Sequence, residues 1–139
     1  MIGYILFRLA DRQLACRLDE VREVVRLDAL EVLPGLTPPI SGLLDLRGNP
    51  LPVVDLRGGG AEARAAARGD VLVMAAGIDA IGVVVDQVTA VLDEDELMPA
   101  DDERPSGLPS YVIEVRRQPG DSAAPILLVD LRALAAVTA

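Results

Sequence analysis

A block of the form Asp-x-Val-x-x-Val occurs at residues 19–24 and again at residues 86–91, 67 positions later. A second block, Val-Asp-Leu-Arg, occurs at residues 54–57 and again at residues 129–132, 75 positions later. Such matches arise either by chance among common aliphatic residues or from an internal duplication. We favour the duplication, which predicts two similar lobes of about 65 residues each, too small to be independent domains.

Short apolar runs separated by turn residues predict β-strands along nearly the whole chain. The runs lie at residues 5–9, 14–18, 23–27, 43–46, 51–56, 71–75, 81–85, 88–92, 112–115 and 126–129. The best candidate for a helix is the short segment 131–137, and residues 61–68 form either a linker or a frayed helical turn. Many short strands with frequent turns are typical of barrels or sandwiches, so the expected fold class is all-β. If the lobes are duplicates, Leu14 should share the environment of Ile81, and Leu18 that of Val85.

The residue inventory excludes most catalytic chemistry. The 139 residues contain no histidine, no lysine and a single cysteine, Cys16. There is therefore no Ser-His-Asp triad, no imidazole metal site, no lysine Schiff base and no internal disulfide. Cys16 lies among apolar residues and is expected to be buried and unreactive. The composition points away from an enzyme, and we expect neither a cofactor nor a metal.

The formal net charge of −9 disfavours nucleic acids and anionic membranes as partners. Seven acidic residues crowd into residues 93–103. This segment lacks the spaced ligands of an EF-hand, so a solvated charge run is expected rather than a calcium site. We see no signal peptide and no apolar run of about 20 residues, which a membrane helix needs. The expected location is therefore the cytoplasm.

The densest pattern lies at residues 40–57. Within it, Arg47 precedes Gly48-Asn49, a pair typical of a hairpin turn. An arginine at such a turn is either a solvated residue or the partner of a nearby acid. Glu23 is the candidate acid, and we predict an ion pair between Glu23 and Arg47 that links two β segments.

Three blocks together resemble the CheW family of chemotaxis coupling proteins. They are Gly42-x-x-x-Leu46-Arg47-Gly48-x-x-x-Pro52-Val53-Val54-Asp55-Leu56, Asp19-x-Val21-x-Glu23-Val24 and Gly82-Val83-Val84-Val85-Asp86-x-Val88. The resemblance covers about residues 3 to 134. It implies one domain over residues 1–139, with two five-stranded β-barrel lobes packed around a shared hydrophobic core. We expect one lobe over residues 1–57 plus the C-terminal segment, and the other over residues 70–115.

The resemblance also implies a function. Family members are non-enzymatic adaptors that couple the cytoplasmic tips of chemoreceptors to the regulatory domain of a CheA-type histidine kinase. They associate with the membrane only through the receptor array. By resemblance, Val21 falls on the kinase-facing patch, and Val71 and Val88 fall near the receptor groove between the lobes. The partner-binding residues expected in full are Val21, Glu23, Gly42, Leu46, Arg47, Val71 and Val88.

Some features depart from the family pattern. Glu114 stands where the family often has glycine after the aromatic Tyr111, the segment 93–109 is unusually acidic, and no long C-terminal helix is evident. These departures leave open a non-flagellar pathway such as pilus motility. A carboxylate-pair hydrolase using Asp55 and Asp130 is the remote enzymatic alternative.

Overall fold

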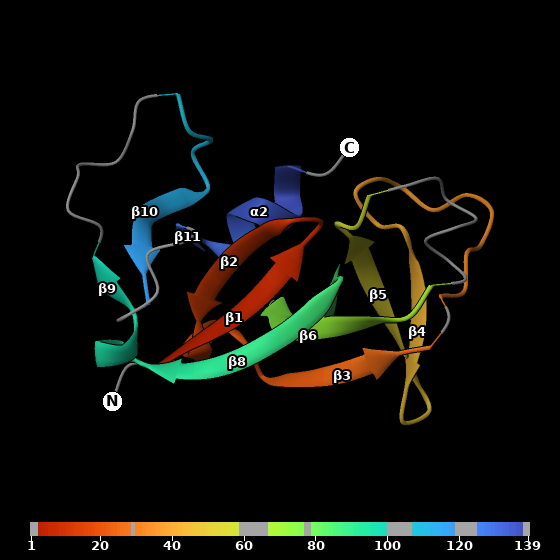
Figure 1. The fold of residues 1–139 in the computed structure, drawn as a ribbon. Helices are drawn as coiled ribbons and strands as arrows, with labels where there is room; N and C mark the ends of the chain where they lie inside the picture. Colours follow the sequence, from red (N-terminus) through yellow and green to blue (C-terminus); the bar gives the residue numbers. More distant parts are fainter. Residues whose placement is uncertain are drawn as a thin grey trace.

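The computed structural model describes residues 3–28, 30–58, 67–76, 79–99, 107–118 and 125–137. Strands dominate this part of the chain (Figure 1). They are β1 (Gly3–Leu9), β2 (Arg12–Arg17), β3 (Glu23–Leu27), β4 (Gly42–Leu46), β5 (Asn49–Asp55), β6 (Gly69–Ala76), β7 (Asp79–Val85), β8 (Gln87–Asp93), β9 (Met98–Pro99), β10 (Val112–Arg117) and β11 (Ile126–Val129). Two 3-10 turns, η1 (Leu18–Glu20) and η2 (Glu94–Glu96), and the helix α2 (Leu131–Val137) are also present. The all-β fold class and the short helix are confirmed.

The strands form two sheets with the same plan. One has the order β8-β1-β2-β11-β10-β9 and the other the order β3-β6-β7-β5-β4. Each is built around an antiparallel hairpin, β1–β2 or β6–β7, and each has one parallel pair, β2 with β11 or β7 with β5. The first five strands of one order therefore correspond one by one to the five strands of the other. The duplication in the sequence is also a duplication in topology.

The halves of the chain exchange their third strands. β3 follows the β1–β2 hairpin in sequence but pairs with β6, and β8 follows the β6–β7 hairpin but pairs with β1. We call the unit of β1, β2 and β8–β11 lobe A, and the unit of β3–β7 lobe B. Strand pairing therefore crosses the expected lobe boundaries, residues 1–57 plus the C-terminal segment and residues 70–115, because it follows the exchange rather than the order along the chain.

The segment that follows each exchanged strand curls its sheet toward a closed barrel. In lobe B, Glu31 N–H donates to Leu43 O at 3.1 Å and Leu43 N–H donates to Glu31 O at 2.8 Å. In lobe A, the short β9 pairs with the end of β10. Met98 lies 67 residues after Glu31, the offset of the repeat. Both lobes thus join the two ends of a five-stranded sheet at corresponding positions.

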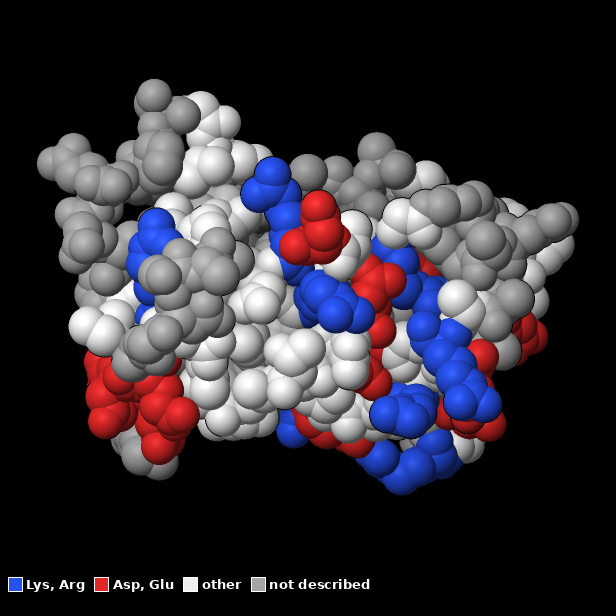
Figure 2. Space-filling model, in the orientation of Figure 1, with Lys and Arg blue, Asp and Glu red and all other residues white. Residues whose placement is uncertain are grey.

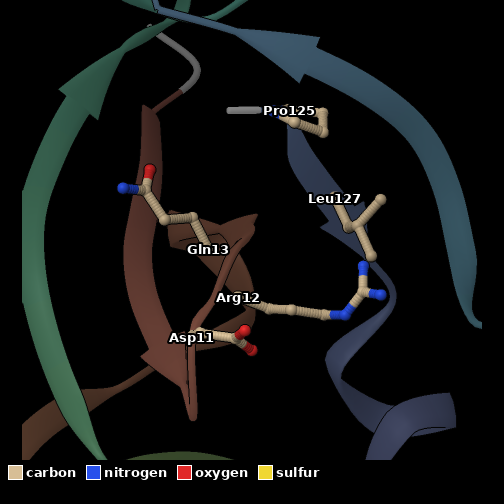
Figure 3. A pocket seen from close by; sticks show the side chains of 5 residues that line it. All are labelled: Asp11, Arg12, Gln13, Pro125 and Leu127. Atoms are coloured by element: carbon tan, nitrogen blue, oxygen red, sulfur yellow. The ribbon is translucent and has the colours of Figure 1, made fainter. Parts of the chain in front are cut away.

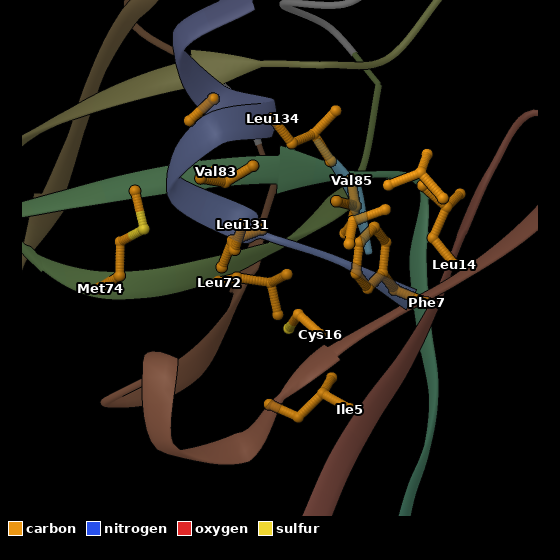
Figure 4. Close-up of a cluster of buried hydrophobic side chains, with 13 residues drawn as sticks. Ile5, Phe7, Leu14, Cys16, Leu72, Met74, Val83, Val85, Leu131 and Leu134 are labelled. Carbon is orange, nitrogen blue, oxygen red and sulfur yellow. The ribbon is translucent and has the colours of Figure 1, made fainter. Parts of the chain in front are cut away.

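Apolar side chains gather in three clusters. One fills the interior of lobe A and includes Tyr4, Leu92 and Leu128. Another fills lobe B and includes Leu51 and Val84. The third, the shared core, lies between the lobes under α2 (Figure 4). Its side chains come from the outer faces of the two central hairpins, from β10 and β11, and from α2. Phe7, Leu72 and Leu131 are among them.

Two residue pairs test the duplication more closely. Leu14 is buried in the shared core and Ile81 packs against the same cluster, as predicted. The second pair differs, because Leu18 is 41% exposed whereas Val85 is fully buried. The reason is local: η1 begins at Leu18, while β7 continues through Val85. The prediction for Leu18 and Val85 is wrong.

Cys16 lies in the shared core, fully buried. Burial, helped by the nearby charge of Glu20, raises the pKa of the Cys16 thiol to about 12. At neutral pH the thiolate population is therefore negligible, and Cys16 acts as a small apolar residue, as expected. Among the described residues no helix is long and apolar enough to cross a membrane.

Candidate partner-binding site

The tip of the β4–β5 hairpin carries an arginine that reaches back to β3. Arg47 and Gly48 form a two-residue turn in which both have positive φ, 51° and 87°. Asp45 Oδ1 accepts the Gly48 N–H at 2.8 Å and fixes the turn. Arg47 then donates to Glu23 through two parallel hydrogen bonds, Nη1 to Oε1 at 2.9 Å and Nη2 to Oε2 at 2.8 Å. The predicted ion pair is confirmed.

This pair joins the two end strands of the lobe B sheet, since β3 begins its order and β4 ends it. Like the bridge between Glu31 and Leu43, the ion pair therefore connects the two ends of the lobe B sheet. The hydrogen bonds from Arg47 lower the pKa of Glu23, so the acid stays charged across the neutral range. The Arg47 side chain is 68% exposed. An exposed pair contributes little to stability, so its main effect is to position the hairpin tip.

Beside the hairpin tip lies a groove of about 610 Å³ that we call the lobe B groove. β5 pairs with β7 only from Val53 onward, so the first half of β5 diverges from the start of β7. Pro50 and Pro52 in this half of β5 have no N–H to pair. The groove is lined by Arg22, Leu46, Asn49, Pro50, Leu51, Pro52, Asp79 and Ala80.

A corresponding groove, the lobe A groove, lies between the starts of β2 and β11 (Figure 3). It is smaller, about 230 Å³, and is lined by Asp11, Arg12, Gln13, Pro125 and Leu127. Arg12 and Asp79 occupy equivalent places in the two grooves, 67 residues apart. The duplicated grooves therefore share their position in the fold but not their charge.

The repeated Asp-x-Val-x-x-Val blocks form a second surface, which we call the valine face: Val21, Val24, Val88 and Val91. Val24 lies opposite Leu72 of β6, and Val91 lies opposite Ile5 of β1. Leu72 and Ile5 both belong to the shared core, so these valines continue the face between the lobes. Val21 and Val88 pack against the core, whereas Val24 and Val91 are 41% and 62% exposed.

Val21 and Val88 are site residues predicted from the sequence, whereas Val24 and Val91 are not among those predicted. The signal was present, because all four belong to the repeated block. In an antiparallel pair, directly opposite side chains point to the same face, so the pairing with β1 and β6 was needed to place them.

Two other predicted site residues lie away from the surface. Val71 is fully buried in the interior of lobe B, so its assignment as a partner-binding residue is wrong. The run of apolar residues in β6 is buried on both faces, which hides the direction of any one side chain. Gly42 is also buried, and a Cβ there would lie 2.7 Å from Glu31 O. Its lack of a side chain allows the bridge that curls the lobe B sheet.

The two carboxylates of the hydrolase alternative are occupied by structural contacts. Asp55 is 1% exposed, and its oxygens accept from Arg57 Nε at 3.0 Å and Nη2 at 2.9 Å. Asp130 caps α2, where its Oδ1 accepts the Ala133 N–H at 3.1 Å. Neither carboxylate is placed to act on a substrate, so the structure contradicts this alternative. Among the described residues no cluster of acidic or cysteine side chains could hold a metal ion.

Charge is unevenly distributed around the valine face. Figure 2 shows acidic side chains gathered over η2, arginines gathered over β3, and uncharged surface over β8 between them. The acidic group is Asp93–Glu96, whereas Asp101, Asp102 and Glu103 lie outside the described residues. Glu114, the departure on β10, binds Arg116 Nε at 2.6 Å, and Arg116 Nη1 donates to Leu97 O at 3.0 Å. The Glu114 carboxylate therefore positions Arg116, which holds β10 against Leu97, the residue before β9.

A family model described as the CheW-like domain matches residues 3–138. The chain belongs to the CheW-like domain family. This is a family of non-enzymatic adaptors of chemotaxis signalling, so the domain is a coupling scaffold and not an enzyme. No curated protein matches the chain.

Among solved structures, the scaffolding protein TtCheW from Thermoanaerobacter tengcongensis is similar to this CheW-like domain. The TM-score is 0.65 at 22% sequence identity, over 94% of this chain and 84% of that one. At this identity the likeness shows the fold: two duplicated β lobes around a shared core.

Proposed function

We propose that this CheW-like domain couples the cytoplasmic tips of chemoreceptors to a CheA-type histidine kinase, in the cytoplasm and beneath the receptor membrane. The observation that carries the proposal is the valine face. Val24 and Val91 are large apolar side chains left exposed by strands whose neighbouring residues pack in the core. Exposed apolar side chains that form a continuous face are typical of a surface that receives a partner.

The two partners are assigned to neighbouring surfaces. A receptor helix lies across the valine face, from Val24 in lobe B to Val88 and Val91 in lobe A. The kinase contacts Val21 and the nearby tip of the β4–β5 hairpin. Glu23 and Arg47 act through geometry, because they hold that tip against β3. Such an interface is small, below about 1,200 Å² in total, and gains strength by repetition in an array.

The test is co-sedimentation with a cytoplasmic chemoreceptor fragment and a CheA-type kinase, with kinase activity measured in parallel. Val91→Asp should weaken receptor binding by at least about tenfold, because it places a charge at the centre of an apolar contact. Ile113→Asp is the matched control, since Ile113 is an exposed apolar residue of β10, 44% exposed. It should bind as the wild type does.

Two outcomes would count against the proposal. One is wild-type protein that binds neither partner at high micromolar concentration. The other is equal loss of binding in the Val91 and Ile113 variants. Binding only to receptor and kinase fragments of a pilus-motility system would assign the adaptor to that pathway instead of flagellar chemotaxis.

A further inference from the structure

The valine face is internally symmetric. Val21 corresponds to Val88 and Val24 to Val91, and the strands that carry them, β3 and β8, hold corresponding positions in the two sheets. If the two lobes changed places, the valine face would therefore run in the opposite direction but present nearly the same apolar residues. On apolar contact alone, a helix lying across this face would bind about equally well in either direction.

Charge breaks this symmetry. Arg26 on β3 corresponds to Asp93 at the end of β8, and both side chains are exposed. Arg22, which directly precedes β3, lies on the same side, with Val24 between it and Arg26. Neither arginine forms an ion pair with another described residue. Beyond Asp93, η2 adds Glu94, Asp95 and Glu96, all exposed. One end of the valine face therefore carries arginines with acidic side chains beside them, and the other end carries acidic side chains alone (Figure 2).

Two acids lie beside these arginines, but neither forms an ion pair with Arg22 or Arg26. Asp70 lies opposite Arg26 on β6, but its Oδ2 accepts the Val88 N–H at 2.7 Å and holds the start of β8. Glu23 is engaged by Arg47. The guanidinium groups of Arg22 and Arg26 thus remain available to a partner.

We propose that this charge difference sets the direction in which a partner helix lies across the valine face. This proposal rests on the proposed function. The partner helix then carries acidic residues at the lobe B end, against Arg22 and Arg26, and basic residues at the lobe A end, against η2. In the reverse direction like charges would meet at both ends. Charges at the rim of an interface select orientation in this way more than they add affinity.

The test is a charge exchange that keeps the net charge. Arg22→Glu and Arg26→Glu combined with Glu94→Arg and Asp95→Arg make the lobe B end the more acidic end of the face. Asp93 and Glu96 are left in place because they form the capping box of η2. Asp11→Arg combined with Arg12→Asp is the control. It also exchanges exposed opposite charges, but beside the lobe A groove at the turn between β1 and β2, outside the valine face.

Direction is measured by cross-linking to a cytoplasmic chemoreceptor fragment. Met98→Cys, at an exposed residue of β9 just beyond η2 and outside the valine face, offers one reactive thiol, because Cys16 is buried with its pKa raised to about 12. A photoreactive maleimide at that position marks which end of the bound helix lies over lobe A. In the protein with wild-type charges, the label should attach to the basic end of the partner helix. The exchange variant should mark the opposite end, or bind about tenfold more weakly at low salt, whereas the control should match the wild type.

The outcomes separate the two proposals. Wild-type protein that fails to bind the fragment overturns the proposed function. Wild-type and exchange proteins that bind equally well and mark the same end overturn the directional role of charge. If the exchange variant does not fold, Arg26→Gln replaces it and should reduce the salt dependence of binding, because screening shortens the Debye length from about 10 Å at 0.1 M to about 3 Å at 1 M. An unchanged salt dependence would then overturn the inference.

Discussion

The two Val-Asp-Leu-Arg blocks show how one residue pattern takes two roles. In the first copy, Arg57 turns inward, binds Asp55, and also donates from Nη1 to Ala67 O at 2.9 Å and Arg68 O at 3.2 Å. It therefore ties the end of β5 to the chain entering β6. In the second copy, Asp130 caps a helix and Arg132 donates to Ala75 O. The difference follows from what comes next in the chain, a return strand or a helix.

Arg57→Met should reduce the free energy of unfolding by about 3–5 kcal/mol, because it leaves the Asp55 carboxylate buried without its cation. Urea unfolding followed by circular dichroism measures the change. Arg17→Met is the control, since Arg17 is an exposed partner of Asp19 at 3.8 Å, and it should change stability by less than about 0.5 kcal/mol. Equal effects of the two substitutions would contradict the assignment of the Asp55–Arg57 pair as a buried ion pair.

At the residue level, the sequence predicted the site where local chemistry was specific. Arg47 before Gly48-Asn49 required a turn, and Glu23 was the acid at hand, so the pair was predictable. Val71 was not, because consecutive buried residues on β6 carry no period that marks one face. The exposure of Val24 and Val91 depends on strand neighbours from the other half of the chain, which no local pattern shows.

Among the elements, β7 contains a glycine that the crowded interior of lobe B requires. A Cβ on Gly82 would lie 2.6 Å from Val71 Cγ1 and 2.8 Å from Val53 Cγ1. The corresponding residue of β2 is Ala15, fully buried, so both lobes use a small residue at this position.

Gly82→Ala should therefore destabilise the fold by about 1–3 kcal/mol through overpacking. Gly58→Ala is the control, because no atom lies within 4 Å of a Cβ built there. Its midpoint of thermal unfolding should stay at or slightly above that of the wild type. An unchanged midpoint for Gly82→Ala would show that the lobe interior has room that the structure does not indicate.

The helix α2 is tied to η1 by one carboxylate, since Glu20 Oε2 accepts the Leu131 N–H at 3.2 Å. Burial raises the pKa of Glu20 above its ordinary value of 4.5, and the nearby charges of Asp130 and Asp19 act in the same direction. The hydrogen bonds from the backbone of Leu131 and Arg17 oppose this shift without cancelling it. The folded chain thus binds this proton more tightly than the unfolded chain does.

A raised pKa in the folded state means that the stability contributed by Glu20 falls as pH rises from about 4.5 through the folded pKa. Glu20→Gln removes the titrating carboxyl group. From about pH 4 to about pH 7, the free energy of unfolding of the wild type should therefore fall relative to that of the variant. Urea titrations of both proteins across this range measure the difference. Parallel stability curves would contradict the assigned shift.

For the molecule as a whole, the strand exchange predicts that the two halves cannot fold separately. A fragment of residues 1–58 contains β1–β5, and a fragment of residues 67–139 contains β6–β11 and α2. Each fragment holds strands of both lobes and completes neither. Each should lack stable sheet structure alone, and an equimolar mixture should recover it, as measured by circular dichroism and gel filtration. A folded, monomeric 1–58 fragment would contradict this expectation.

Much of this architecture could be predicted from the sequence, because turn residues bound each strand and the repeat indicates two lobes. The positions of the strands and of the helix at 131–137 follow from local patterns alone. The exchange of β3 and β8 does not, since the same repeat is compatible with two separate lobes or with two lobes that trade strands. Only the pairing of β3 with β6 and of β8 with β1 decides between them.

The exchange also has a consequence for how the protein is made. The lobe A sheet joins β1 and β2 to β8, β10 and β11, so its first hairpin leaves the ribosome long before its neighbours are synthesised. The β1 edge of that hairpin lacks its final partner until Asp93 has emerged, and the β2 edge lacks its partner until Val129 has emerged. Such unpaired edges are prone to aggregation. Folding must wait for pairings between distant parts of the chain, which makes it slow compared with that of a helical protein of this length. Nascent chains of this protein are therefore natural clients for a chaperone that covers exposed strands.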